Sequence, residues 1–197
     1  ATRPLPVPDS PSGSPYLEFT YTVLIPLLVF LPAFISGSIA ADSLAEEIER
    51  GTLELLLVAP VTPAGVLDGK TLAMTAIVPA QATLWLGFLA LNGTRIAHPL
   101  AILVMVTGLA VVLVSLGAAL ALVLRSRTEA QLVYSLAAMA LFGFATLLPE
   151  DPANVVAKLA IGSPTTTTVL TVFAIAAAAL PVYALVRQVV ARQPLSG

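Results

Sequence analysis

The sequence contains no cysteine and only one histidine, His98. The chain therefore has no disulfide bonds, no thiolate nucleophile and no cysteine-based metal site, and its redox compartment leaves no trace in the sequence. A protein zinc site needs three or four ligands, and His98 has neither a second histidine nor a cysteine to share a metal with. We expect no metal site and no catalytic role for this histidine.

Charged residues are also scarce, at 10% of the 197 residues, whereas apolar residues make up 58%. A soluble domain carries about 25% charged residues, and the mean hydropathy here is +0.97. These values predict an integral membrane protein with a single membrane domain. The net charge of −2 gives no electrostatic basis for binding nucleic acid.

Five stretches of the sequence are free of charge and long enough to cross a hydrocarbon core of about 30 Å as helices. They are residues 19–41, 71–91, 100–124, 130–148 and 165–186. None shows the period-two alternation of a spanning strand, so we predict an all-α polytopic helix bundle. The absence of acids, bases and histidine from these spans argues against proton-coupled transport and against intramembrane catalysis.

Local signals mark several details of this bundle. Ser163 followed by Pro164 has the form of an N-cap and first helical residue, and predicts the start of the last span. The Pro-Glu-Asp-Pro sequence at 149–152 predicts a turn that ends the fourth span. Gly37 and Ala41, four residues apart, predict close helix packing within one chain or across a dimer.

The basic residues of the connections are divided unequally between the two sides of the membrane. One side carries Arg50, Lys70, Arg125, Arg127, Arg187 and Arg192, and the other carries Arg3, Arg95 and Lys158. Cytoplasmic connections are enriched in lysine and arginine, so the first side is predicted to be cytoplasmic. This orientation describes a multi-pass protein of the cell membrane with a cytoplasmic C-terminus and an external segment 1–18.

The connection between the first two spans contains six of the eleven acidic residues of the chain. On a helix, Asp42, Glu46, Arg50 and Glu54 fall at successive i, i+4 positions, so opposite charges would pair around Arg50. The apolar residues occupy another face, which predicts an amphipathic element along the membrane surface, broken near Gly51. On this pattern alone, the element is a solvated juxtamembrane helix.

A longer motif in the same connection adds a functional expectation. The string Glu-Arg-Gly-Thr-Leu-Glu at 49–54, followed by Leu56, Pro60 and Gly69-Lys70, resembles the cytoplasmic signature of ABC-2 type transporter permeases. In that family, the region docks on a separate ATP-binding subunit. The resemblance implies that this chain is the permease subunit of an ATP-driven exporter, paired with a second copy or a homologue. ATP and Mg²⁺ would belong to the partner subunit, and this chain would hold no cofactor.

The resemblance also assigns roles within the cytoplasmic coupling segment. The residues expected to contact the ATPase subunit are Glu46, Glu49, Arg50, Gly51, Thr52, Leu53, Glu54, Leu56 and Leu57. The charged members would make polar contacts, and the leucines would seat in an apolar groove. Family members usually have six spans, so we expect residues 1–18 to follow a missing first span and residues 19–197 to form the transmembrane domain.

Two other functions are compatible with the same sequence features. A haem- or metal-maturation permease has a related layout, and a non-transporting assembly or anchoring subunit would use the same segment only to recruit a soluble protein. Residues 65–71 approximate a phosphate-binding loop, but three residues instead of four separate the first glycine from Gly69-Lys70, and no strand precedes them. The chain itself is therefore not expected to be an enzyme.

Overall fold

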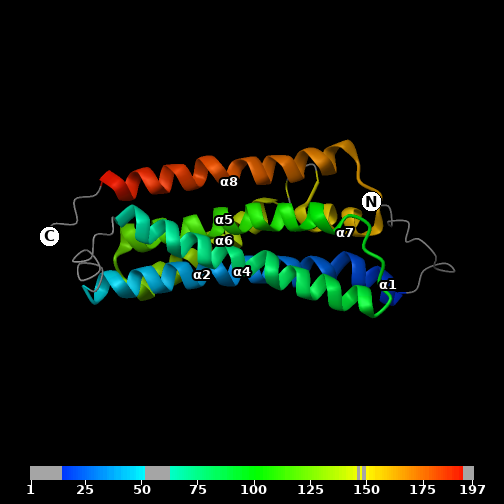
Figure 1. Ribbon diagram of the computed structural model, residues 1–197, viewed down its shortest axis with the longest axis horizontal. Helices are drawn as coiled ribbons and strands as arrows, with labels where there is room; N and C mark the ends of the chain where they lie inside the picture. Colours follow the sequence, from blue (N-terminus) through cyan, green and yellow to red (C-terminus); the bar gives the residue numbers. More distant parts are fainter. Residues whose placement is uncertain (1–14, 52–62, 146, 148–149, 193–197) are drawn as a thin grey trace.

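The chain folds into a bundle of long helices that run along one common direction (Figure 1). This computed structural model describes residues 15–51, 63–145, 147 and 150–192. In chain order the elements are α1 (Pro15–Phe19), the π-helical turn η1 (Thr20–Leu24), α2 (Ile25–Glu49), α4 (Pro63–Leu91), α5 (Pro99–Leu124), α6 (Arg127–Ala145), α7 (Pro152–Ile161) and α8 (Thr166–Arg192). The described residues form no strand, and the predicted all-α class is confirmed.

Among the described residues, five helical segments are long and apolar enough to cross a membrane. They are Pro15–Glu49, Leu67–Leu91, Pro99–Leu124, Arg127–Ala145 and Thr166–Val189. Their outward faces expose large apolar side chains, including those of Leu27, Leu132 and Phe173. Hydrocarbon solvates such a surface, whereas water does not. The prediction of a polytopic membrane bundle is therefore confirmed.

The first span is longer than predicted, because α1, η1 and α2 form one continuous helix. The predicted boundary between residues 18 and 19 falls inside it. The wider π-helical turn ends two residues before Pro26, which has no N–H to donate to the preceding turn. At its other end the helix passes Asp42, the first acidic residue of the predicted connection, and continues to Glu49, because Leu44 in between is buried.

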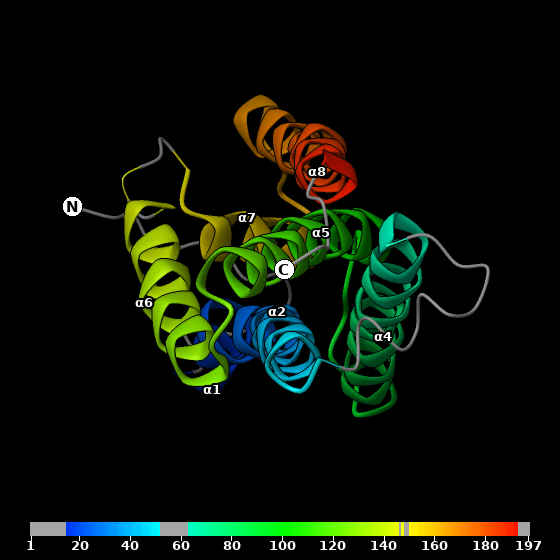
Figure 2. The ribbon, with the colours of Figure 1, turned by 90° about the vertical axis from the view of Figure 1, so that its left-hand side faces the viewer.

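Helix α5 occupies the centre of the bundle, with α2 and α8 on opposite sides of it and α4 and α6 at the flanks (Figure 2). Its contact with α2 is a direct approach of two backbones. A Cβ atom added at Gly117 would lie 2.3 Å from the carbonyl oxygen of Gly37 and 3.1 Å from the backbone nitrogen of Ala41. Small residues permit this approach, so the predicted packing of Gly37 and Ala41 is confirmed within one chain.

The other helices are fixed to this pair by specific contacts. On the α8 side, a Cβ added at Gly108 would lie 2.8 Å from the Cα of Ala176, so this crossing is also close. On the α6 side, the buried Tyr134 hydroxyl donates a hydrogen bond to the carbonyl oxygen of Phe34 at 2.9 Å. The Phe34 ring also packs edge-on against Phe142, with 5.8 Å between the ring centroids.

The connection between α6 and α8 contains the short helix α7, where the sequence predicted only a turn. Asp151 caps this helix, since its carboxylate accepts the N–H of Ala153 at 2.9 Å, and Pro152 stands in the first turn. The prediction missed α7 because an Asp-Pro pair that ends one helix is equally suited to start another. At ten residues, α7 is about 15 Å long and does not cross a membrane.

The start of α8 also differs from the prediction. Ser163 and Pro164 precede the helix, and the cap is made two residues later. The hydroxyl of Thr165 accepts the N–H of Thr168 at 3.2 Å, and the hydroxyl of Thr168 accepts the N–H of Thr165 at 3.1 Å. This reciprocal pair satisfies two N–H groups in the manner of a capping box.

Glu150 lies beside these caps, with only 6% of its side chain exposed. The ammonium group of Lys158 donates to its Oε1 atom, and the hydroxyl of Thr165 donates to the same atom at 3.3 Å. Burial raises the pKa of Glu150, but the hydrogen bonds from Lys158 and Thr168 outweigh this effect. The pKa of this carboxyl is therefore below its ordinary value.

The close crossing of α2 and α5 predicts that Gly117→Ala destabilises the bundle. The new methyl group would overlap the Gly37 carbonyl oxygen, and such overpacking costs about 1–3 kcal/mol. Thermal unfolding of the detergent-solubilised protein measures the effect. Gly87→Ala is the matched control, because a Cβ there meets nothing within 4 Å. Equal unfolding temperatures for the two variants would contradict the direct backbone contact.

The environment of Glu150 predicts a pH dependence of stability. Its pKa is lower in the folded protein than in the unfolded chain, so its charged form stabilises the fold above about pH 4.3, the ordinary range of glutamate. This contribution is lost as the pH falls through the folded pKa. Glu150→Gln should lower the unfolding temperature at pH 7 and flatten its decline in acid. Glu129→Gln, at an exposed position, serves as the control. If the unfolding temperatures of Glu150→Gln and the parent decreased in parallel as the pH falls, the charge of Glu150 would not stabilise the fold.

Candidate functional site

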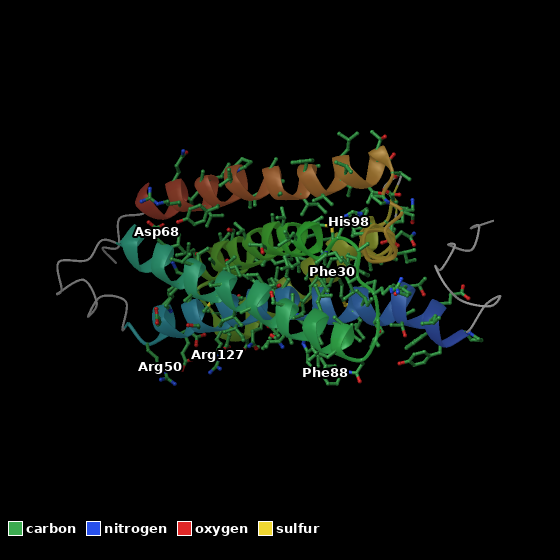
Figure 3. The ribbon with its side chains drawn as sticks, turned by 45° about the vertical axis from the view of Figure 1, so that its right-hand side comes forward. Phe30, Arg50, Asp68, Phe88, His98 and Arg127 are labelled. Atoms are coloured by element: carbon green, nitrogen blue, oxygen red, sulfur yellow. The ribbon has the colours of Figure 1, made fainter. Side chains whose placement is uncertain are left out.

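A network of ion pairs lies at one end of the membrane bundle, which we call the charged end; Arg50, Asp68 and Arg127 are labelled there in Figure 3. It is formed by the C-terminal turns of α2 and α8 and the N-terminal turns of α4 and α6. Its ion-paired and hydrogen-bonded residues include Asp42, Glu46, Glu47, Glu49, Arg50, Asp68, Lys70, Arg127 and Arg187. Four of the basic residues that the sequence assigned to one side of the membrane thus share this end.

Arg127, the first residue of α6, joins that helix to the end of α2. Its guanidinium donates two hydrogen bonds to the carboxylate of Asp42, one of them at 2.8 Å from Nη2 to Oδ2. Its Nη1 atom lies 3.8 Å from Oε2 of Glu46, and its backbone N–H donates to Oε1 of Glu49 at 2.7 Å. The three acids stand on one face of α2 because they are four and three residues apart.

Two further contacts extend the network to α4 and α8. The Lys70 ammonium lies 2.6 Å from a carboxylate oxygen of Glu47 and donates to the Ser43 hydroxyl at 3.0 Å, which joins α4 to α2. Arg187 of α8 donates from Nε to both carboxylate oxygens of Asp68, at 3.0 and 3.1 Å. The Tyr183 hydroxyl, also on α8, donates to the same carboxylate. The end of α2 is therefore connected through ion pairs to α6 and α4, and through α4 to α8.

Arg50 stands at the outer margin of this network. Its guanidinium pairs with Glu46 at 2.7 Å, one helical turn earlier, and its side chain is 68% exposed. The helix ends here, and Gly51 follows with a φ of +65°, in the left-handed region that favours glycine. The predicted pairing of Arg50 with Glu46 is thus present and the predicted break near Gly51 is confirmed, but Asp42 pairs with Arg127 instead.

The orientation of the predicted amphipathic element needs correction. Residues 42–49 were expected to lie along the membrane surface, but they form the last two turns of α2 and continue its axis (Figure 1). The reason is that Leu44 and Ala45 are buried in a cluster with Ala121 and Tyr134. The further predicted contact residues Thr52, Leu53, Glu54, Leu56 and Leu57 lie outside the described residues.

Lys70, Asp68 and Arg127 were not predicted as members of this site. Lys70 belongs to the sequence motif, but the predicted contact residues were all taken from positions 46–57, whereas these three residues come from α4 and α6. The only signal for Arg127 was its place among the basic residues of one membrane side. Lys70 lies within α4, together with residues 65–71 that approximated a phosphate-binding loop. Because these residues are helical, they cannot surround a phosphate as that loop does. Lys70 instead joins α4 to α2 through Glu47 and Ser43.

Neither a metal centre nor a catalytic constellation emerges from the described part of the chain. No group of three or more histidine, cysteine, aspartate or glutamate side chains there is arranged to hold a metal ion. The carboxylates of Asp42, Glu46 and Glu49 all face Arg127. His98 is exposed, and its backbone N–H donates to the carbonyl oxygen of Leu159 at 3.1 Å.

Comparison with protein families gives a match over nearly the whole chain. Residues 1–190 match the family described as ABC-2 family transporter protein. No curated protein and no solved structure gives a match. The family match agrees with the bundle of apolar helices and confirms the resemblance carried by the motif at 49–54. The chain belongs to the ABC-2 transporter family and is a multi-pass membrane permease.

Proposed function

We propose that this chain is the membrane subunit of an ATP-driven exporter and that its charged end receives the motion of a separate ATP-binding subunit. The family match supports the permease role. The observation that carries the coupling role is the ion-pair network from α2 through Arg127, Lys70 and Asp68 to three other helices. ATP and Mg²⁺ bind to the partner, and two permease chains, identical or homologous, complete the complex.

The positive charges of the charged end support a cytoplasmic location for it. Arg50, Lys70, Arg125, Arg127 and Arg187 stand at the ends of helices there. Connections rich in arginine and lysine remain in the cytoplasm during membrane insertion. In this orientation, the charged end faces the compartment that supplies ATP.

Helix α2 would act as a lever. Its close crossing with α5 is at Gly37, and Arg50 lies thirteen residues further along the chain, about 20 Å along a helix axis. A push on the end of α2 would therefore tilt the helix about the crossing. Arg127 and Lys70 would pass the displacement to α6 and α4, which is a rigid-body route between inward- and outward-open states.

The exposed end of α2 would provide the contact surface for the partner. Arg50 and Glu49 are exposed at the outer margin of the ion-pair network. Gly51 would redirect the chain, and we propose that the following residues, which include Leu53 and Leu56, seat in an apolar groove of the ATPase. Charged contacts at such a surface would set orientation, and the leucines would provide the buried area.

Arg50→Glu should uncouple the complex without unfolding the membrane domain. An exposed helical pair such as Arg50–Glu46 contributes only about 0.3–0.5 kcal/mol to stability, whereas a charge lost from a desolvated subunit contact costs about 2–5 kcal/mol. We expect an unchanged unfolding temperature, weaker association with the ATPase and loss of stimulated turnover. Arg50→Lys, which keeps the charge, is the control and should retain most of the association. Normal turnover in Arg50→Glu would refute the coupling role.

The proposed orientation can be tested with single cysteines, since the chain has none of its own. Ser126 lies in the turn between α5 and α6 at the charged end, and Asn154 is exposed on α7 at the opposite end. A membrane-impermeant thiol reagent applied to intact cells should label Asn154→Cys and leave Ser126→Cys unlabelled until the cells are opened. The reverse pattern would invert the topology and remove the charged end from the cytoplasm.

A further inference from the structure

A groove of about 580 Å³ lies between α4 and α8, with α5 as its floor. The two outer helices are joined at the charged end and diverge toward the opposite end of the bundle (Figure 1). Leu72 of α4 and Leu180 of α8 line the groove and are 71% and 74% exposed, so it opens toward the lipid. No described residue of α2 lines it, and it is therefore separate from the contact surface proposed on that helix. Its other apolar lining residues are Val104, Gly108, Val111, Ala176 and Ala179.

The groove extends through most of one leaflet of the membrane. Asp68 stands at the start of the apolar segment Leu67–Leu91, and Thr75 lies seven residues further along α4, about 10 Å deeper along the helix axis. On α8, Tyr183 and Ala176 are also seven residues apart. One leaflet of a hydrocarbon core of about 30 Å is about 15 Å thick. The groove thus begins at the boundary with water and ends within the leaflet at the charged end.

The mouth of the groove carries one charge of each sign, and both have hydrogen-bonding positions to spare. The Asp68 carboxylate accepts from Nε of Arg187 and from the Tyr183 hydroxyl, whereas a carboxylate offers about four acceptor positions. Arg187 donates to Asp68 through Nε, and its Nη atoms make no hydrogen bond with the described residues. The two side chains are 35% and 49% exposed. A ligand at the mouth can therefore donate to Asp68 and accept from Arg187.

A threonine adds a polar position below this mouth. Thr75 lines the groove and is only 8% exposed, and its hydroxyl has no hydrogen-bond partner among the described residues. Buried hydroxyl groups normally have one. A threonine side chain in a helix has two χ1 rotamers available, so its hydroxyl can turn to donate to a carbonyl group that enters the groove. An ester carbonyl between a headgroup and an acyl chain is such an acceptor.

We propose that this groove binds a phospholipid whose headgroup carries both an ammonium N–H and a phosphate, as in phosphatidylethanolamine. The ammonium group donates to Asp68, the phosphate accepts from the Nη atoms of Arg187, and an ester carbonyl accepts from Thr75. One acyl chain lies along the apolar walls. A choline headgroup has no N–H to donate, and a phosphatidylglycerol headgroup has no positive charge for Asp68. The site belongs to the permease alone and does not depend on coupling to an ATPase.

A tryptophan placed at the edge of the groove reports binding. Leu180→Trp is combined with Trp85→Phe, which removes the only native tryptophan. The permease is reconstituted in phosphatidylcholine vesicles with increasing fractions of phosphatidylethanolamine, phosphatidylcholine or phosphatidylglycerol that carry the same dibrominated acyl chains. Bromine quenches the fluorescence of a nearby tryptophan. Phosphatidylethanolamine should reach half-maximal quenching at an about fivefold lower mole fraction than the other two lipids, the ratio that one net hydrogen bond gives.

Three further substitutions in this reporter chain assign the preference to named groups. Asp68→Asn removes the charged acceptor and should abolish the preference for phosphatidylethanolamine. Tyr183→Phe is its matched control, because it also removes a hydrogen bond between α4 and α8 but keeps the carboxylate, and it should retain the preference. Thr75→Val keeps nearly the same shape and should raise the half-maximal fraction of phosphatidylethanolamine about fivefold.

Four results would overturn the proposal. The first is half-maximal quenching by phosphatidylcholine or phosphatidylglycerol at the same fraction as by phosphatidylethanolamine in the reporter chain. The others are a preference that survives Asp68→Asn, a preference that is lost in Tyr183→Phe, and an unchanged half-maximal fraction in Thr75→Val.

Discussion

The direct contact between Gly37 of α2 and Gly117 of α5 fixes the arrangement of the remaining helices. In a bilayer, helices gain little from excluding lipid, so their association depends on close van der Waals packing. Backbones approach this closely only where a Cβ is absent, and a methyl group at Gly117 would overlap the Gly37 carbonyl oxygen. With α2 so placed, α5 receives α8 on its opposite side through Gly108 and leaves its flanks to α4 and α6 (Figure 2).

The ion pairs at the charged end complement this packing contact. Hydrocarbon cannot solvate charges, so the spans keep their charged residues near their ends, where polar contacts between helices add to the packing of their apolar faces. Arg127 joins α6 to α2, and Lys70 joins α4 to α2. In the proposed exporter, a partner that moves the end of α2 would thereby act on the whole end of the bundle.

The apolar runs were sufficient to predict the helices of the bundle, because a bilayer permits few other structures for them. The ends of the helices were harder to predict. Asp42 suggested the start of a water-exposed segment, yet α2 continues because Leu44 is buried and because the Asp42 carboxylate is bound by Arg127, 85 residues away in the sequence. Spacing along one helix could indicate only the local pairing of Arg50 with Glu46. A contact between two helices, such as that of Asp42 with Arg127, leaves no local pattern in the sequence, because its residues are far apart along the chain.

Arg127 holds the start of α6 to the end of α2. The distance between spin labels at Gly69→Cys on α4 and Thr128→Cys on α6 tests it most directly, because both positions are exposed at the charged end. Double electron–electron resonance should give one narrow distance distribution in the otherwise cysteine-free chain and in the control Arg125→Gln. Adding Arg127→Gln should broaden and lengthen it, since α6 loses its contacts with Asp42 and Glu46. An unchanged distribution would show that packing alone holds the helices there and would contradict this role of Arg127.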